Sequence, residues 1–295
     1  GVVLFAINIG ATLVRAGKWN SITISTASAV SYLVLAGMVG MLMGLNFAFE
    51  WWGEWHDRLL GAHLWLGAVG WFGFLITGFS YKLMPMFTLS HGYRDSLPKW
   101  IILLAHLGII GGVLSFLLDV AWLKYAALVA VVADLQLYSF HLSRIYKLRH
   151  KHPGSGVRAA QFISIALAAA GALVVLLVPV IPDLMLSSSM IVILGWMYLW
   201  GWVGLTVLAY LSKIVPFLWW THKYGGKIGK MKTPTMAEMM DDHKIRFWLT
   251  AIVASLFVML AGISWNLPVM IMVGGTLLSV TSLMYVGQIA LVFTK

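Results

Sequence analysis

Long apolar segments recur along almost the whole chain, and they constrain its fold more than any other feature. A helix needs about 20 apolar residues to cross a bilayer core. The 295 residues here are 61% hydrophobic and only 10% charged. The segments are continuously apolar instead of alternating, and a backbone in lipid must satisfy its own hydrogen bonds, so they predict helices and not barrel strands. We expect spans at residues 1–14 (partial), 23–49, 60–87, 100–119, 122–147, 160–181, 187–219, 246–265 and 268–293. The predicted fold is therefore an all-α membrane protein.

Basic residues gather in every second loop between these segments. By the positive-inside rule, the basic loops are cytoplasmic, and the protein is predicted to be a multi-pass protein of the cytoplasmic membrane. The residues of these loops are Arg15, Lys18, Arg94, Lys99, Arg144, Lys147, Arg149, Lys151, Arg158, Lys223, Lys227, Lys230, Lys232, Lys244, Arg246 and Lys295. This distribution explains the net charge of +10 without a nucleic-acid partner.

The absence of cysteine limits the chemistry that the chain can perform. It excludes disulfides, thiolate metal sites and thiol catalysis. A haem or a metal ion would need His, Met, Tyr or carboxylate ligands.

The sequence opens inside an apolar run without an initiator Met, so we expect the native chain to begin further upstream.

The stretch at residues 61–93 recurs at residues 196–224. Identical residues are separated by 131 positions in each case, as for Trp65 and Trp196 (196 − 65 = 131). The pairs are Trp65/Trp196, Gly70/Gly201, Trp71/Trp202, Gly73/Gly204, Lys82/Lys213, Pro85/Pro216, His91/His222 and Tyr93/Tyr224. Unrelated apolar helices rarely share Lys, Pro, His and Tyr in one register, so the pattern indicates an internal repeat.

A weaker pattern extends the repeat beyond this stretch. Three spans, each four spans after the last, end in aromatic-x-x-Asn/His/Gln, at residues 5–8, 138–141 and 285–288. We therefore expect tandem four-helix repeats within one transmembrane domain, 1–295. Residues 1–18 would end a truncated upstream repeat, 19–150 would form the first complete repeat, and 151–295 the second.

This organisation resembles subunit I of the haem-copper oxidases and nitric oxide reductases, in which four-helix units repeat three times about a pseudo-threefold axis. The pattern His63-Leu-Trp-Leu-Gly67, followed by Gly70, Gly73, Gly78, Tyr81 and Pro85, is similar to that of small membrane proteins of this kind. The resemblance covers the whole chain by topology, and by motif only 61–93 and 196–224. It implies a haem ligand at His63 and a place in respiratory or nitrogen-oxide-related electron transport.

The ligands of that family's gas-reducing centre are missing from this chain. There are no adjacent histidines and no His-Pro-Glu, and the His-x-His sequence His150-Lys-His152 lies in a basic loop. Leu194 stands where the second repeat would carry the equivalent of His63. A haem-copper binuclear centre cannot be assembled from these residues, so we do not expect the chain to reduce oxygen or nitric oxide.

His63 is the strongest candidate for a cofactor ligand, because an imidazole in hydrocarbon needs a partner. It could ligate a b-type haem, with Met43 or Met41 of the preceding span as second ligand, and His/Met ligation gives a cytochrome of raised potential. The methionines, including Met38, could instead pass copper(I) to His63. The alternative is a histidine that only hydrogen-bonds a neighbouring helix.

His106 and His141 form the second candidate for haem or metal binding. They are expected at similar depth on antiparallel neighbouring helices, where two imidazoles could clamp a haem b. Asp134, Tyr138 and His141 follow i, i+4, i+7 spacing and so should share one helix face. Asp134 could carry protons or orient a ligand. The alternative is a buried polar network that closes the four-helix unit.

Two repeated pairs of polar residues complete the candidates. Lys82 and Lys213 each precede a proline by three residues. Such lysines usually reach the lipid headgroups, although we also assign them to a proton-carrying polar network. His91 and His222 lie outside the membrane and could bridge a metal ion, but a turn retained from duplication is the simpler interpretation.

Two functions remain open from the sequence. The first is a haem-binding integral membrane subunit that moves electrons between a quinol pool and a partner protein, without a gas-reducing centre of its own. Its partners would be the lipid bilayer and other membrane or periplasmic subunits of a redox complex. The second is a non-redox membrane scaffold, or a copper or proton conduit, on the same fold.

Overall fold

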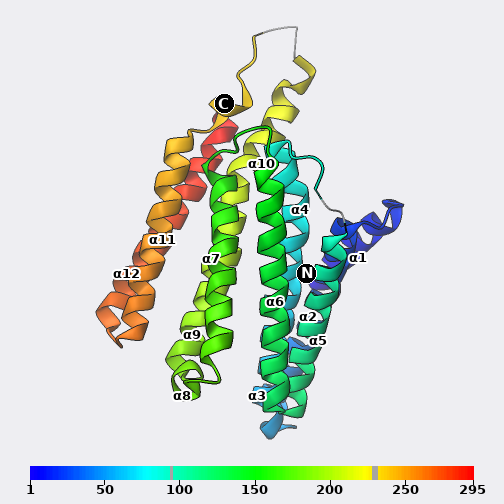
Figure 1. Cartoon of the computed structure of the whole chain (residues 1–295), viewed down its shortest axis with the longest axis vertical. Coiled ribbons are helices and arrows are strands. Elements are labelled where there is room, and N and C mark those ends of the chain that lie inside the picture. Colours follow the sequence, from blue (N-terminus) through cyan, green and yellow to red (C-terminus); the bar gives the residue numbers. More distant parts are fainter. Residues whose placement is uncertain (94–95, 228–231) are drawn as a thin grey trace. The chain divides into compact units, whose positions relative to one another are not determined.

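The computed structural model describes residues 1–93, 96–227 and 232–295, and every secondary-structure element in this part of the chain is a helix (Figure 1). The prediction of an all-α, multi-pass membrane protein is confirmed, because eight helices in this part of the chain are long and apolar enough to cross a bilayer. Arg94 and Lys230, expected in basic loops, lie outside the described residues. The eight spans are Ser21–Phe49, Gly53–Thr88, Leu97–Leu118, Ala121–Lys147, Ser155–Leu177, Ser188–Lys227, Asp242–Ser264 and Pro268–Thr294.

Most spans are single α-helices. These are α2 (Ser21–Phe49), α5 (Leu97–Leu118), α6 (Ala121–Lys147), α7 (Ser155–Leu177), α11 (Asp242–Ser264) and α12 (Pro268–Ala290), the last followed by η6 (Leu291–Thr294). Three short elements lie before or between the spans: α1 (Val2–Arg15), α8 (Pro182–Met185) and η5 (Met236–Met239). α1 has no buried residue, and at 14 residues it is too short to cross a bilayer core, as expected of a partial span.

Two spans are each built from several consecutive helices. The first contains η1 (Gly53–Trp55), α3 (His56–Leu64), η2 (Trp65–Gly73) and α4 (Phe74–Thr88). The second contains α9 (Ser188–Trp196), η3 (Met197–Gly204), α10 (Leu205–Tyr224) and η4 (Gly225–Lys227). These two spans are the ones that carry the repeated sequence.

Both copies of the repeated sequence contain a π-helical segment in the same register. η2 covers residues 65–73, and adding the repeat distance of 131 gives 196–204, which η3 matches to within one residue. Each π-helical segment leads into an α-helix with an internal proline, Pro85 in α4 and Pro216 in α10. Because π-helices longer than a single turn are rare, this coincidence supports the internal repeat independently of residue identity.

The chain divides into two compact units. Unit one comprises Gly1–Met86, Ser90–Leu148 and Ala168–Leu176, and unit two comprises Phe87–Leu89, Arg149–Leu167 and Leu177–Lys295. The main division, between Leu148 and Arg149, falls close to the predicted division between repeats at residue 150. The repeats at 19–150 and 151–295 themselves stay a prediction.

Glycines set the close packing of helices in unit one. Gly108 of α5 lies directly against Val131 of α6, so that any side chain at residue 108 would clash. One turn further along α5, Gly112 lies against the indole of Trp65, whose Nε1 donates a hydrogen bond to the Gly108 carbonyl at 3.1 Å. Small residues allow this approach in membranes, where close van der Waals contact drives helix association. α5 is therefore fixed against both α6 and η2.

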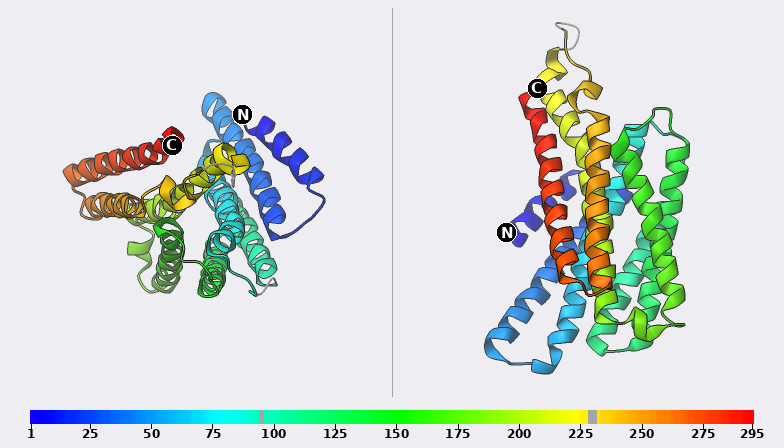
Figure 2. Two further views of the ribbon diagram at one scale, coloured as in Figure 1. Left: turned by 90° about the horizontal axis from the view of Figure 1, so that it is seen from above. Right: turned by 90° about the vertical axis from the view of Figure 1, so that its left-hand side faces the viewer.

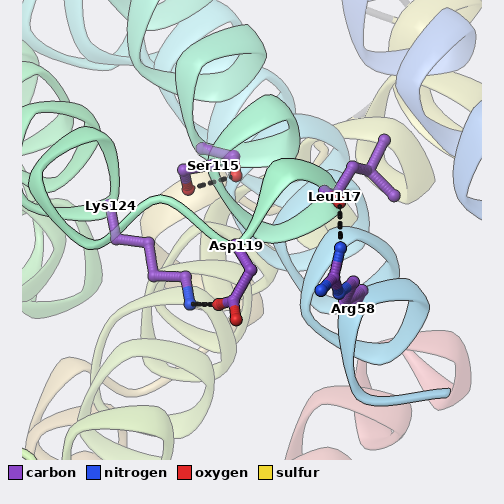
Figure 3. Close-up of polar contacts among 6 residues, drawn as sticks. Arg58, Ser115, Leu117, Asp119 and Lys124 are labelled. Atoms are coloured by element: carbon purple, nitrogen blue, oxygen red, sulfur yellow. Dashed lines mark hydrogen bonds and ion pairs between the residues drawn. The ribbon is translucent and has the colours of Figure 1, made fainter. Parts of the chain in front are cut away.

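A polar cluster closes the turn between α5 and α6 (Figure 3). Asp119 ends α5 in a left-handed conformation, with φ of 55°, and accepts a hydrogen bond from Lys124 Nζ at 2.6 Å. That hydrogen bond holds the pKa of the Asp119 carboxyl below its ordinary value. Arg58 of α3 donates to the Leu117 carbonyl at 3.3 Å, which satisfies one of the last carbonyls of α5.

In unit two, α11 and α12 form a closely packed pair, visible side by side in orange and red in Figure 2. Gly262 of α11 lies against the backbone at Met270 and Ile271, and Gly274 of α12 lies against the backbone at Met259. Backbone contact of this kind leaves no room for a methyl group at either glycine. Close van der Waals packing therefore holds α11 and α12 together, as in other membrane helix pairs.

Candidate functional site

His63 lies near the end of α3, half-buried against α2 within unit one. Its Nδ1 is 2.9 Å from the carbonyl oxygen of Ala36. A carbonyl oxygen only accepts hydrogen bonds, so Nδ1 must carry the proton, and the lone pair of the neutral ring resides on Nε2. Metal-bound histidines have this arrangement, in which a backbone carbonyl fixes the tautomer and the opposite nitrogen is the ligand.

A glycine of α2 lies directly against the ring of His63. A methyl group added at Gly40 of α2 would lie 3.0 Å from its Cε1, so the ring rests directly on the backbone of α2. Methyl groups at Gly44 and Gly67 would meet no atom within 4 Å. The ring therefore packs closely on α2, whereas the helix surfaces at Gly44, one turn beyond Gly40, and at Gly67, about one turn beyond His63, are open.

Met43 shares a helix face with the residues that touch His63. Ala36, Gly40 and Met43 follow i, i+4, i+7 spacing on α2, and the side chain of Met43 is half-buried. Met41 lies on a different face and is 63% exposed. Of the two methionines considered as a second ligand, only Met43 lies on the His63 side of α2.

His106 is held by two hydroxyl groups from α2. The Tyr32 hydroxyl lies 2.6 Å from its Nδ1, and Ser28 Oγ lies 3.2 Å from its Nε2. The ring also packs on Phe74 of α4, at 4.8 Å between centroids. Both ring nitrogens therefore have hydrogen-bond partners, as expected for a buried polar network.

The structure does not bring His106 and His141 together. Helices α5 and α6 are antiparallel neighbours, as predicted, but Gly108 and Gly111 form the face of α5 that touches α6. Gly108 is two residues after His106 and therefore about 200° around the helix. The His106 ring consequently turns toward α2, away from α6. The sequence predicts that the two helices are neighbours but not this rotation.

His141 lies in a second cluster, between aromatic rings. It is 1% exposed, and its ring centroid is 5.4 Å from that of Tyr81 and 6.2 Å from that of Tyr93. Tyr81 belongs to α4, and Tyr93 to the segment after it. His141 thus faces α4 and the segment that follows, all within unit one.

Asp134 and Tyr138 complete this cluster on α6. Asp134 is 7% exposed and Tyr138 is 1% exposed, so with His141 they form one buried face. The Tyr138 hydroxyl donates to Ser80 Oγ of α4 at 2.8 Å. Oδ1 of Asp134 and the hydroxyl of Tyr81 are both buried and have no hydrogen-bond partner among the described residues. The ring of Tyr81 packs against that of Tyr138, at 6.0 Å between centroids, one turn of α6 from Asp134.

The two repeated lysines have different surroundings. Lys82 is exposed, as expected for a lysine that reaches the headgroups. Lys213 is half-buried, lies against Gly154 and interacts electrostatically with Asp242. The Asp242 carboxylate accepts hydrogen bonds from the Ser155 N–H and hydroxyl at 2.7 and 2.6 Å. Lys213 therefore belongs to a cluster in unit two that joins the starts of α7 and α11, whereas Asp134 belongs to unit one, and a polar network shared by the two residues stays a prediction.

Several of these residues were not singled out from the sequence. Ser28 and Tyr32 have i, i+4 spacing on an apolar helix, which was the available signal for a shared polar face. Ser80 carried no signal, because serine is common in membrane helices. His91 belongs to unit one and His222 to unit two, so the suggested metal-bridging pair stays a prediction.

Comparisons with protein-family models, with curated proteins and with solved structures find no match to this chain. The candidate sites therefore rest on the residues and geometry described above.

Proposed function

We propose that this chain is a haem-binding integral membrane subunit that transfers electrons within a redox complex, with His63 as a haem ligand. The observation that carries the proposal is the 2.9 Å contact between His63 Nδ1 and the Ala36 carbonyl. It fixes the tautomer whose Nε2 lone pair can bind iron. The family resemblance of the sequence points to the same residue.

Small residues near His63 would leave room for a flat macrocycle. Gly40 brings the imidazole onto the backbone of α2, and the helix surfaces at Gly44 and Gly67, each about one turn further along, are open. Met43, on the same face of α2, is the residue that would supply a thioether as second ligand. A b-type haem held there would supply one-electron chemistry at a raised potential.

His106 and His141 have other roles in this proposal. The hydrogen bonds from Tyr32 and Ser28 use both nitrogens of His106, so this ring serves to join α5 to α2. His141 belongs to the Asp134 cluster. The proposal therefore needs one histidine ligand from this chain, and the basic loops would face the cytoplasm by the positive-inside rule.

The direct test is reduction by a quinol. Purified protein in lipid nanodiscs would be mixed with a reduced short-chain quinol, and the absorption spectrum would be followed for the sharp α-band of ferrous haem. We expect the band in the wild-type protein and its loss in His63→Ala. His106→Ala is the matched control, since it removes another membrane imidazole and should keep the band. A wild-type protein without the band, or equal spectra for the two variants, would contradict the proposal.

A second candidate function is a membrane module without redox chemistry, either a scaffold or a proton conduit. The observation that favours it is the Asp134 cluster, because an ionisable residue inside a membrane helix is functional by default. Under this alternative His63→Ala would leave the spectrum unchanged, whereas substitutions at Asp134 would alter proton binding or complex assembly.

A further inference from the structure

A carboxyl group lies deep inside the helices of unit one without a hydrogen-bond donor. Asp134 is 93% buried, given its 7% exposure, and its Oδ1 makes no hydrogen bond within the described part of the chain. An unpaired ionised carboxylate in such a place would cost several kcal/mol, which favours the neutral, protonated form. Packing alone does not explain why a membrane helix has a carboxylic acid whose Oδ1 accepts no hydrogen bond from the described residues.

A second unused polar atom lies in the same cluster of side chains. The hydroxyl of Tyr81, on α4, is buried and likewise lacks a hydrogen-bond partner among the described residues. The ring of Tyr81 packs against that of Tyr138, at 6.0 Å between centroids, and Tyr138 lies one turn of α6 from Asp134. A phenol is a good donor to a carboxylate, so a hydrogen bond from Tyr81 would stabilise the ionised form of Asp134. The pair can therefore exist in both protonation states of the acid.

Other groups that face Asp134 do not replace Tyr81 as a hydrogen-bond donor to its carboxylate. Tyr138, on the same face of α6, already donates its hydroxyl proton to Ser80 at 2.8 Å. α5 contacts this part of α6 through Gly108, against Val131, and its His106 turns to α2. α7 contributes the Ala168 carbonyl to Gln136 and Gly171 to Val132, neither of which titrates.

Titratable side chains also connect Asp134 to the end of the helices. The rings of Tyr93 and His141 are 6.2 Å apart, and those of His141 and Tyr81 are 5.4 Å apart. Tyr93 is half-buried in the segment that follows α4. The row Tyr93, His141, Tyr81, Asp134 thus leads from a loop into the membrane interior, entirely within unit one.

We infer that Asp134 is a reversible proton-binding site inside the membrane, with Tyr81 as its switching donor and the row through His141 and Tyr93 as its connection to solvent. The ligand is a proton, which enters from the loop, binds Asp134 Oδ1, and leaves by the same row. The inference does not depend on haem binding at His63, since the two sites share no residue.

Infrared difference spectroscopy tests this site directly. Protein reconstituted in lipid would be measured between about pH 6 and 10, where exposed carboxyl groups stay ionised because their ordinary pKa is about 4. We expect the carbonyl band of a protonated carboxylic acid to disappear as the pH rises and to shift when water is replaced by heavy water. The band should be absent in Asp134→Asn and displaced in Asp134→Glu.

Two further variants sharpen the result. Asp119→Asn is the matched control, since Asp119 is exposed at the α5–α6 turn and its loss should leave the band unchanged. Tyr81→Phe should shift the band, because the carboxyl group loses its neighbouring hydroxyl. A wild-type protein without a protonated-carboxyl band, a band that survives in Asp134→Asn, or a band that Tyr81→Phe leaves unmoved would each overturn the inference. If Asp134→Asn does not fold, the displacement in Asp134→Glu decides the assignment.

Discussion

His63 and His106 show how one residue type acquires two roles from its neighbours. His63 meets a backbone carbonyl, which can only accept, so its tautomer is fixed and Nε2 keeps a lone pair. His106 meets two hydroxyls, which can donate or accept, and both nitrogens are used. A hydroxyl-rich partner therefore makes a structural histidine, and a carbonyl partner leaves a potential ligand.

The hydrogen bond between Tyr32 and His106 should contribute to stability. In Tyr32→Phe the phenol proton is lost while the ring that packs on Phe74 is kept. We expect the free energy of unfolding to fall by about 1 kcal/mol, since interhelical hydrogen bonds in membranes average somewhat less and reach about 1.7 kcal/mol. Unfolding in mixed micelles measures it. Ser28→Ala, which removes the longer 3.2 Å contact, should cost less. A larger loss for Ser28→Ala would contradict this ranking.

The carboxyl of Asp119 should titrate below the ordinary Asp pKa of about 3.9. Its pKa is lowered by the hydrogen bond from Lys124, so the native state favours the ionised form. The ionised carboxyl therefore stabilises the native state at pH values above the ordinary pKa, and this stabilisation is lost as the pH falls through the lowered pKa. In Lys124→Gln the pKa of Asp119 should rise to the ordinary value. NMR titration of carbon-labelled aspartate measures both, and an unchanged pKa in Lys124→Gln would show that the ion pair is absent in solution.

At the scale of elements, the π-helical segments η2 and η3 are the features that most distinguish this chain. A π-helical segment places more residues in each turn than an α-helix and so rotates whatever precedes it. η2 therefore sets the direction in which α3 presents His63 and the buried residues Leu59 and Ala62. Its counterpart η3 follows α9, which has no buried residue and carries Leu194 in place of the histidine.

Deleting one residue from η2 should therefore misdirect α3. Deletion of Gly67 removes one position from the segment and turns the preceding residues by about 100° relative to α4. The His63–Ala36 hydrogen bond and the contact of Gly61 with Phe116 would be broken. We expect the free energy of unfolding to fall by about 2 kcal/mol or more.

Gly67→Ala is the control for that deletion, because an added methyl group meets no atom within 4 Å. The substitution should change stability little, and alanine has a higher helix propensity than glycine. If the deletion and the substitution had equal effects on thermal unfolding, η2 would not determine the direction of α3.

At the scale of the whole molecule, the sequence predicted the spans well because bilayer thickness and backbone hydrogen bonding leave few choices. The expected segment 23–49, for example, corresponds to α2 at Ser21–Phe49. The sequence did not give the rotation of each helix, which depends on close contacts such as Gly108 against Val131. For that reason it could be predicted that α5 and α6 are neighbours, but not that His106 and His141 would face different helices. The Asp134 face was predictable from spacing, whereas its partners Ser80 and Tyr81 on α4 were not.

The orientation of the chain can be tested with single cysteines, because the sequence has none of its own. The positive-inside rule predicts that Glu54→Cys and Asn266→Cys react with a membrane-impermeant thiol reagent on intact cells. His152→Cys and Thr233→Cys should react only after permeabilisation. His152, Thr233 and Asn266 lie in segments between the membrane spans, and Glu54 lies in η1, at the very start of the span Gly53–Thr88. The reverse labelling pattern would place the basic loops outside.

The most direct test of the account is the haem content of the purified protein, measured as the pyridine haemochrome together with total protein. The account predicts haem b in the wild-type protein, its loss in His63→Ala, and its retention in His106→Ala, whose ring is already bound by Tyr32 and Ser28. Wild-type protein purified from haem-replete cells without any haem, or with haem that persists in His63→Ala, would contradict it.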